Sequence, residues 1–262
     1  MAASTSNTGT TGSSAPSVPA SLASTIPRPS PEKLYILCAI DGPDASSNTA
    51  FADSLASELR GQGQDTIVIH LDDFRNTRTI RHVRGRHSPE GFYRDTYNYH
   101  AFLSSVLDPL QPTGSRMFRT KHTDHHRDVY LSELESPYIT ASSKGLIVLI
   151  EGMFLHRDGL VGYWDWSLFL FATFKATAKR MLERGGVGNG DPNSAEVKRF
   201  IGGQSLYYRE SEPWRRAGWV VESSDFEARR ILNKEELERL SGHIHREELR
   251  YYMEDSQINW DN

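Results

Sequence analysis

The sequence has almost no cysteine, no long apolar run and no excess of positive charge. Cys38 is its single cysteine, so an internal disulfide and a zinc site built from several thiolates are both excluded. This cysteine usage fits a reducing compartment and predicts a cytoplasmic protein. No stretch approaches the roughly 18 consecutive apolar residues that a bilayer-spanning helix needs, which predicts a protein without a membrane partner.

The charge balance gives no general signature of nucleic-acid binding. The 262 residues hold 30 lysines and arginines against 34 aspartates and glutamates, a formal net charge of −4. Hydrophobic residues make up 37% of the chain and aromatic residues 10%, which is enough for a packed core. One elaborated domain is therefore expected at residues 32–235, followed by a helical tail at 236–262.

The first 31 residues are rich in serine, threonine, alanine and proline, and Arg28 is their one charged side chain. A segment of this composition cannot bury enough apolar surface to offset the entropy lost on ordering, so a disordered tail is predicted at 1–31. The lack of acidic residues leaves a transit peptide as the alternative, although one arginine makes a poor cationic amphipathic helix.

Short apolar runs alternate with helical patterns along the rest of the chain. Residues 33–41 form an apolar, β-favouring run that stops at Gly42, and apolar residues recur at helical spacing over 49–60. Further strands are expected at 66–71, 145–150, 167–173 and 219–225, with a helical stretch at 175–185. This alternation predicts an α/β fold of three layers, with a mainly parallel sheet between two layers of helices.

Carboxylates follow three of the predicted strands, at Asp41, at Asp72 with Asp73, and at Glu151. The carboxyl ends of parallel strands meet at one edge of the sheet, where the ligands of such folds gather. Any one of these carboxylates taken singly also fits a turn cap, so their common edge is what indicates a site. The segment 75–143 shows little regular periodicity and is expected to cover this edge as a lid or substrate-binding excursion.

The loop after the first strand has the position of a phosphate-binding loop but only part of its pattern. Such a loop reads Gly, four residues, Gly-Lys-Ser/Thr, so that backbone amides hold phosphates and the lysine reaches the terminal ones. Gly42 and Thr49 match this pattern. Ser47 replaces the second glycine and is expected to hinder a positive φ, and Asn48 replaces the charged lysine. The alternative is a turn that caps the following helix, since serine, aspartate and asparagine all serve as caps.

Beyond the loop, several segments form a collinear pattern along the chain. They are LYILCAIDGPDASSNTAFADSLASEL (34–59), LDDF (71–74), SPEGFYRDTYNYHAF (88–102), PLQP (109–112), RTKHTDHHRD (119–128), LIVLIEGMFLHRDGL (146–160), WDWSLFL (164–170), RMLERG (180–185) and RFIGGQSLYYRESEPWRRAGWVV (199–221). Taken in this order, they resemble the uridine kinase-like branch of the P-loop nucleoside and metabolite kinases. The resemblance covers most of residues 33–230 and implies the P-loop kinase fold with a degenerate phosphate-binding loop.

The resemblance implies a role for each matching residue. Asp72 matches the carboxylate that accepts the proton of the attacking hydroxyl, and Asp73 takes this place at the substrate if the register shifts by one. Thr49 matches the magnesium-binding hydroxyl, and Glu151 matches the carboxylate that orients the metal or its water. The nucleotide phosphates would lie on the loop residues Gly42, Ser46, Ser47, Asn48 and Thr49.

Substrate and lid residues are implied in the same way. The substrate region carries Tyr93, Asn98 and His122, with Asn98 at the place where the family has an aspartate for the sugar hydroxyls. Arg184 and Arg199 match the lid arginines that stabilise charge on the transferring phosphoryl group. The stretch 75–87 adds five arginines and two histidines and is expected to face phosphate, whereas nucleic-acid binding is not favoured.

The resemblance as a whole implies an ATP- and Mg²⁺-dependent phosphotransferase that acts on a hydroxyl of a nucleoside or similar small metabolite. The alternative is a catalytically impaired pseudoenzyme or nucleotide-binding protein, because Asn48 lacks the charge of the customary lysine. Losing one preorganised charged donor costs about 3 kcal/mol, roughly a hundredfold in rate. Lys121 or Arg119 is a candidate to supply the missing charge across the cleft. The acceptor and a homo-oligomeric state are left open.

Overall fold

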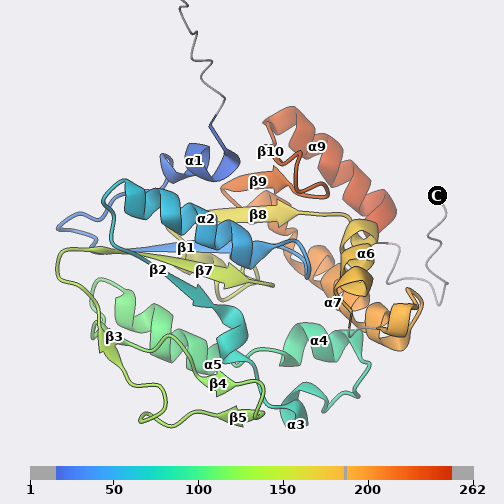
Figure 1. The fold of residues 1–262 in the computed structure, drawn as a ribbon, viewed down its shortest axis with the longest axis horizontal. Coiled ribbons are helices and arrows are strands. Elements are labelled where there is room, and N and C mark those ends of the chain that lie inside the picture. The colour runs from blue at the N-terminus through green and yellow to red at the C-terminus, as the bar shows by residue number, and fades with distance from the viewer. Residues whose placement is uncertain (1–15, 186–187, 250–262) are drawn as a thin grey trace, which may run out of the picture.

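A sheet of six strands runs through the middle of the protein (Figure 1). The computed structural model describes residues 16–185 and 188–249. In sheet order the strands are β10 (Arg230–Ile231), β9 (Trp219–Glu222), β8 (Trp166–Phe171), β1 (Tyr35–Asp41), β7 (Leu146–Gly152) and β2 (Thr66–His70). Neighbouring strands run parallel except β10, which is antiparallel to β9. The predicted α/β class with a mainly parallel sheet is confirmed.

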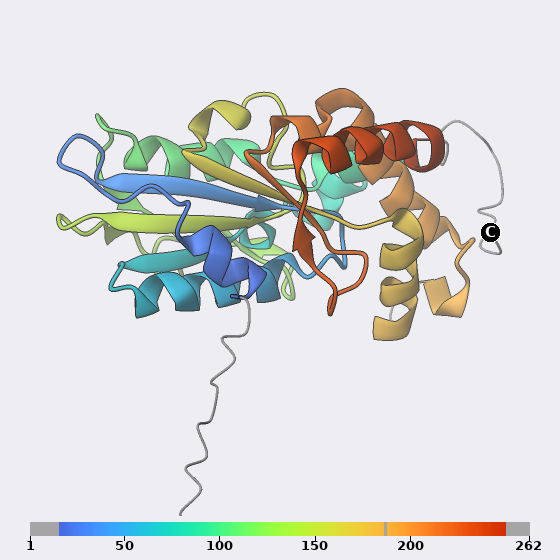
Figure 2. The ribbon, with the colours of Figure 1, turned by 90° about the horizontal axis from the view of Figure 1, so that it is seen from above.

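Helices cover both faces of this sheet, as the three-layer prediction requires. The α-helices are α1 (Val18–Ala23), α2 (Asn48–Gly61), α3 (Arg78–Arg81), α4 (Pro89–Asp95), α5 (Tyr99–Phe102), α6 (Phe174–Arg184), α7 (Ala195–Ser211), α8 (Pro213–Arg216) and α9 (Lys234–His243). Short 3-10 or π-helical turns occupy Leu71–Phe74, Leu103–Leu107, Asp108–Leu110, Val161–Tyr163, Gly188–Gly190 and Ile244–Glu248. Figure 2 shows α1 and α2 on one side of the sheet and α9 on the other.

The central strand β1 is buried along its whole length. Its side chains alternate between two hydrophobic clusters: Leu37 and Ala39 join the larger one, whereas Cys38 and Ile40 join the cluster that includes α1 and α2. A strand with helices on both faces needs an apolar residue at nearly every position, which is why this run is continuous rather than alternating. The end of β1 therefore opens onto the loop from a fixed, central position.

Residues 16–31 are not disordered, which corrects the tail expected at 1–31. Helix α1 packs against α2, and Leu22 and Ile26 are buried in the same cluster as Leu55. The side chain of Ser17 caps the helix by accepting from Ala20 N at 3.3 Å. The composition of this segment does not indicate a helix, because a few apolar residues stand among many serines and threonines. Burial of those apolar residues against α2 is nevertheless enough to order it. Residues 1–15 lie outside the described part.

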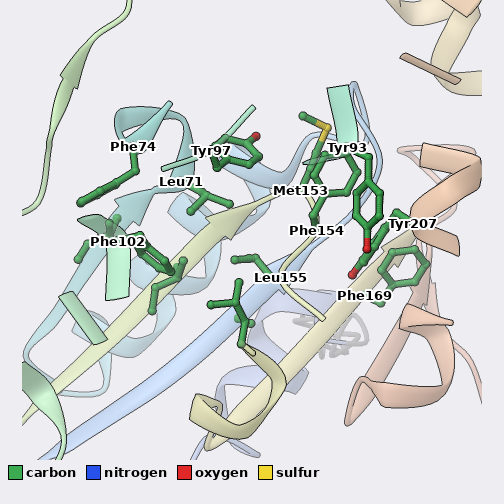
Figure 3. Packing of buried hydrophobic residues seen from close by; sticks show 14 of the residues in the cluster. Leu71, Phe74, Tyr93, Tyr97, Phe102, Met153, Phe154, Leu155, Phe169 and Tyr207 are labelled. Carbon is green, nitrogen blue, oxygen red and sulfur yellow. The ribbon is translucent and has the colours of Figure 1, made fainter. Parts of the chain in front are cut away.

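The excursion at 75–143 packs into the main core. Besides α3, α4 and α5 it contains two short antiparallel pairs, β3 (Met117–Phe118) with β6 (Ile139–Thr140) and β4 (Thr123–Asp124) with β5 (Val129–Tyr130). Figure 3 shows side chains of the excursion among those that follow β2 and β7. The rings of Phe74 and Phe102 meet edge to face with their centroids 5.3 Å apart. These contacts fix the excursion over the carboxyl edge of the sheet.

The predicted strands are confirmed, with ends that shift by a few residues. The last of them, expected to reach residue 225, ends at Glu222. Helix α7 and strand β10 are elements that the sequence patterns do not predict. Helix α9 begins at Lys234, two residues before the expected tail at 236–262, because Asn233 and Glu236 form a capping box; positions 250–262 of that tail lie outside the described residues. No helix within 16–185 and 188–249 is long and apolar enough to cross a membrane.

Candidate functional site

The loop between β1 and α2 turns through two left-handed residues. Ala45 has a φ of 59° and Ser47 a φ of 68°. The left-handed backbone conformation costs a residue with a Cβ roughly 1–2 kcal/mol, so glycine normally occupies such positions. The expectation that Ser47 hinders a positive φ is therefore wrong, because the serine adopts the left-handed conformation and α2 begins directly after it.

Asn48 holds this loop from the inside. Its Nδ2 donates to the carbonyl oxygens of Gly42 and Gly152, each at 3.1 Å, and Ser46 Oγ donates to its Oδ1 at 2.6 Å. A Cβ added to Gly42 would lie only 2.5 Å from Asn48 Oδ1 and 2.9 Å from the backbone oxygen of Leu170. The residue that replaces the customary lysine thus ties the loop to the end of β7, and it requires glycine at position 42.

Two backbone amides of the loop are bonded to side-chain oxygens. Asp44 N donates to Gln204 Oε1 at 2.7 Å, and Ala45 N donates to the carboxylate of Asp44 at 2.7 Å. A third amide, that of Ser46, donates to Pro43 O at 3.1 Å. The carboxylate of Asp44 therefore lies on an amide that would otherwise be free to hold a phosphate oxygen.

Thr49, on the first turn of α2, lies beside Glu151 near the end of β7. Thr49 Oγ1 donates to Glu151 Oε1 at 3.0 Å, so the structure brings together the two residues predicted to hold magnesium. His70 Nδ1 lies 2.6 Å from the same oxygen, because the parallel register of β2 and β7 pairs His70 with Glu151. The hydrogen bond to Glu151 raises the pKa of His70. His70 was not predicted from the sequence. The one feature that could have indicated it is its position as a polar residue at the carboxyl end of a strand.

The oxygens of Thr49 and Glu151 fit a magnesium ion. Mg²⁺ prefers oxygen ligands and keeps several waters, so one or two protein oxygens suffice when phosphates supply the others. Within the described residues, no group of three or more His, Cys, Asp or Glu side chains could hold a metal ion. The donor set therefore suits a metal shared with phosphate oxygens.

A cavity of about 440 Å³ opens over the loop, and we call it the loop cleft. It brings the loop, Asp72, Glu151 and the basic residues of α6 to a single space. Its lining residues are 43–50, Asp72, Arg75, Tyr97, 151–153, Arg180, Arg184 and Phe226.

Asp72, just beyond β2, faces the loop cleft in a fixed orientation. Arg75 donates to both of its carboxylate oxygens, from Nε at 3.1 Å and from Nη2 at 2.6 Å. Tyr97 donates its hydroxyl proton to Asp72 Oδ1 at 2.9 Å. Burial, reinforced by the charge of Asp72, raises the pKa of Tyr97, so its hydroxyl remains a donor. The carboxylate is nevertheless about half exposed, with a side-chain exposure of 47%.

Asp73, the alternative to Asp72, is not among the residues that line the loop cleft. Its carboxylate lies 3.1 Å from Lys121 Nζ, and its backbone oxygen accepts from His122 N at 2.9 Å. Both aspartates lie in the short 3-10 turn at Leu71–Phe74, and their carboxylates contact different neighbours.

The three other residues expected at the substrate also lie away from the lining of the loop cleft. Tyr93 is 2% exposed and packs in the core beside Phe154. Asn98 caps α5, since its Oδ1 accepts from Ala101 N at 3.0 Å. The ring of His122 lies parallel to that of Phe74, and burial lowers its pKa. Their roles toward a substrate remain predictions.

The two arginines expected in a lid lie in different places. Arg184 lines the loop cleft and lies 3.3 Å from the Asp44 carboxylate. Arg199 lines a different cavity. Arg180, which sequence reasoning missed, donates to Ala45 O at 3.3 Å and to Ser223 O at 3.1 Å from α6. Its signal was present in the segment RMLERG, one turn before Arg184.

Lys121 and Arg119 do not reach the loop, which corrects the expectation that one of them supplies the missing charge. Lys121 pairs with Asp73, and the buried Arg119 donates to the backbone oxygens of Leu131 and Ser132 at 3.2 and 3.1 Å. Both residues lie in the excursion, and neither lines the loop cleft. The cations that line the loop cleft are Arg75, Arg180 and Arg184.

Comparison with known proteins identifies the fold. No protein-family model matches the sequence, and no curated protein matches it. A solved protein described as a possible uridine kinase from Bacillus stearothermophilus aligns with a TM-score of 0.55 at 22% identity, over 71% of this chain and 88% of the other. A provisionally assigned fructose transport system kinase from Silicibacter sp. TM1040 aligns with a TM-score of 0.57 at 21% identity, over 76% and 95%.

A more distant likeness has the same architecture. Phosphoribulokinase from Rhodobacter spheroides aligns with a TM-score of 0.51 at 12% identity, over 73% of this chain and 70% of the other. In all three alignments the shared part takes in most of the present chain. The protein therefore has the same three-layer α/β fold, with a mainly parallel sheet, as these three solved proteins.

Proposed function

We propose that this protein is an ATP- and Mg²⁺-dependent phosphotransferase that acts on a hydroxyl of a nucleoside or similar small metabolite. The observation that carries the proposal is the content of the loop cleft, which holds Asp72, the Thr49–Glu151 pair and three arginines. These residues come from segments far apart in the chain. If each of these residues only capped a turn or formed a surface ion pair, nothing would require all of them to line the same cavity.

The phosphates of a nucleotide would lie at the start of α2. Backbone amides and the helix dipole favour an anion there, and the proposed site uses both. Arg180 and Arg184 extend from α6 and Arg75 follows β2, so three guanidinium groups line the cleft although Asn48 is neutral. A phosphate oxygen that takes the Ala45 amide displaces the Asp44 carboxylate.

Thr49 and Glu151 would hold the magnesium ion by their oxygens. When bound, the ion offsets the negative charge of the phosphate oxygens. Glu151 is only 6% exposed, and His70 holds it in place through a hydrogen bond at 2.6 Å. The chain thus presents its ligands in a fixed orientation before the ion arrives.

Asp72 would accept the proton of the acceptor hydroxyl. As the bond between the terminal phosphorus and the bridging oxygen of ATP breaks and ADP leaves, the acceptor oxygen bonds to phosphorus and its proton passes to Asp72. The Arg75 guanidinium and the Tyr97 hydroxyl orient the carboxylate by three hydrogen bonds. A carboxylate held in this way is positioned to take the proton of the hydroxyl as the phosphoryl group is transferred.

Nucleotide binding without efficient transfer is the second candidate function. It is favoured by Asn48, whose amide is committed to the carbonyl oxygens of Gly42 and Gly152 and carries no charge toward a phosphate. The Asp44 carboxylate on Ala45 N further opposes an incoming anion. Such a protein would bind nucleotide weakly and turn it over slowly or not at all.

The test is ATP turnover by the full chain with Mg²⁺, against a panel of nucleosides and small hydroxyl metabolites. Asp72→Asn is expected to lower kcat by about a hundredfold or more and to leave nucleotide binding in place. Asp65→Asn is the matched control, because Asp65 is exposed and precedes β2 at the other end of the same strand. It is expected to leave turnover unchanged.

The outcomes separate the two candidates. Equal turnover by wild type and Asp72→Asn would contradict the proton-accepting role. Nucleotide binding with no transfer to any acceptor would favour the second candidate. A chain that binds no nucleotide, measured by calorimetry with saturating Mg²⁺, would exclude both.

A further inference from the structure

A second cavity, of about 460 Å³, lies between the start of α7 and the segment that carries α3 and leads into α4. We call it the arginine cleft. Helix α7 lines it, and α4 packs against α7 (Figure 1). The proposed transfer takes place in the loop cleft and leaves this cavity without a role. Its lining includes Arg78, His82, Arg86, Glu196, Arg199 and Phe200.

Positive charge in the arginine cleft exceeds negative charge. Three arginines line it against one carboxylate, that of Glu196, which lies 3.4 Å from Arg86 and also accepts from Gly188 N at 2.9 Å. Arg78 uses its backbone amide to bind Asp128. In the described part of the chain, the guanidinium groups of Arg78 and Arg199 have no carboxylate partner. A small anion would supply the missing counter-charge.

The guanidinium of Arg199 is held in place while keeping a free donor. It lies over the rings of Phe92 and Phe200, with centroids 5.2 and 5.5 Å away. Ring faces stabilise a guanidinium without using its N–H groups. Its Nη2 atom is buried and has no hydrogen-bond partner among the residues described. A buried donor without a partner is costly, so the arrangement is incomplete until an acceptor binds.

Neighbouring positive charges crowd the arginine cleft. Burial, with the charges of Arg81, Arg75 and Arg86, lowers the pKa of Arg199 to about 10. Burial and the charges of neighbouring arginines, that of Arg199 foremost, also lower the pKa of His82. Crowding of this kind is relieved by a phosphate group, which accepts hydrogen bonds from several guanidinium groups at once.

The arginine cleft adjoins the site of transfer. Arg75 binds Asp72 and lines the loop cleft, whereas Arg78, three residues further along, lines the arginine cleft. Three residues span at most about 11 Å of chain, so the backbone positions of Arg75 and Arg78 lie no further apart than this. The charge of Arg75 contributes to lowering the pKa of both Arg81 and Arg199, which agrees with this closeness.

We propose that the arginine cleft binds a phosphomonoester group of the acceptor, so that the substrate already carries one phosphate and offers a free hydroxyl to Asp72. The transfer step rests on the proposed function, whereas the anion site depends on the arginine cleft alone. A phosphate of ATP has the same chemistry, but its expected place is the loop cleft. Competition between the two ligands therefore distinguishes the sources.

The first test is calorimetric titration of the full chain with inorganic phosphate, in the presence of a saturating, non-hydrolysable ATP analogue and Mg²⁺. Phosphate is expected to bind under these conditions, and Arg78→Gln and Arg199→Gln are each expected to weaken it by about tenfold or more. Arg239→Gln is the matched control, because Arg239 is an exposed arginine on α9 that pairs with Glu235 and lines neither cleft. It is expected to change nothing.

Several outcomes would overturn the proposal. They are absence of phosphate binding, its displacement by the nucleotide analogue, and equal affinity in wild type and both cleft variants. Circular dichroism checks that the variants fold. Arg78 is exposed, so Arg78→Gln decides the result if Arg199→Gln proves unstable.

The second test compares acceptors in pairs that differ only by one phosphate group. The phosphorylated member is expected to have a KM about tenfold lower or better with wild type, and Arg78→Gln is expected to remove that advantage without lowering kcat. A preference for the unphosphorylated member would overturn the assignment of the substrate. If no acceptor is turned over while phosphate binding still depends on Arg78, the proposed function fails and the anion site stands.

Discussion

The side-chain amide of Asn48 donates to the backbone oxygen of Gly42 across 3.1 Å, joining the first and last parts of the loop. A second hydrogen bond from the same amide reaches Gly152 on β7. A lysine at this position would place a flexible, charged group where the asparagine places a short, neutral one. The loop is therefore kept in shape without the charge that normally accompanies that shape.

Asn48→Lys is expected to raise the rate of phosphoryl transfer. A lysine restores one positive charge beside the phosphates, worth about 3 kcal/mol of transition-state stabilisation, or roughly a hundredfold in kcat. Turnover of ATP with the best acceptor of the panel measures the effect. Asn48→Gln, which lengthens the side chain but adds no charge, is the control and is expected to give no gain. An equal effect of both variants would show that length and not charge matters.

Gly42→Ala is expected to destabilise the protein by about 1–3 kcal/mol, because the new methyl group collides with Asn48 Oδ1, Ser46 Oγ and the backbone of Leu170. Gly61→Ala is the matched comparison, since a Cβ at position 61 meets nothing within 4 Å. At the end of α2 this alanine is expected to be neutral or to stabilise by up to about 1 kcal/mol. Urea unfolding of the two variants gives the free energies directly, and similar values for both would refute the steric argument.

Asp41→Asn is expected to cost about 3–5 kcal/mol of stability, because Asp41 is a fully buried carboxylate whose Oδ2 accepts several hydrogen bonds. His156 donates to it from Nδ1 at 2.8 Å and from its backbone amide at 3.1 Å, and the Tyr207 hydroxyl donates to the same oxygen. Tyr207→Phe keeps the ring and removes one donor, so it is expected to cost only about 1–2 kcal/mol. Thermal or denaturant unfolding checks the order of the two losses. The prediction fails if Asp41→Asn is the milder change.

The ion pair of His243 with Glu248 is expected to make stability depend on pH. The Glu248 carboxylate, 3.5 Å from His243 Nε2, raises the pKa of His243 in the folded state. The stabilisation is fully present below the unfolded value, about pH 6.5, and is lost as pH rises through the higher folded value. Because the imidazole is 41% exposed, the change stays below about 1 kcal/mol. Unfolding midpoints at about pH 6 and pH 9 measure it, and His243→Gln is expected to flatten the difference.

The elements of the sheet could be predicted because their signals are local. The strands at β1 and β7 are continuous apolar runs, and each is followed by a carboxylate or glycine that ends the pattern. Helix α1 could not be found in the same way, since its apolar residues stand in a segment whose composition is that of a disordered tail. Only its contact with α2 supplies the burial that orders it.

The residues of the candidate site likewise divide into those that local sequence signals indicate and those that only tertiary contacts reveal. Thr49, Glu151 and Asp72 were identified from the motifs of a family, and the structure gathers them in the loop cleft. Sequence reasoning missed His70 because no motif marks it, and it missed Arg180 although the segment RMLERG begins with this residue. The first depends on the register of β2 against β7, and the second on where α6 passes the loop.

Sequence alone determined the alternation of strands and helices, the single loop that replaces lysine by asparagine, and the carboxylates that end the strands. Periodicity and residue type act over a few neighbouring positions, which is why they can be read without coordinates. The tertiary structure alone decided which of these residues meet. Thr49 and Glu151 are 102 positions apart, and their contact exists because β1 lies between its parallel neighbours β7 and β8. Packing likewise separated Arg184 from Arg199 and so created a second, positively charged cavity.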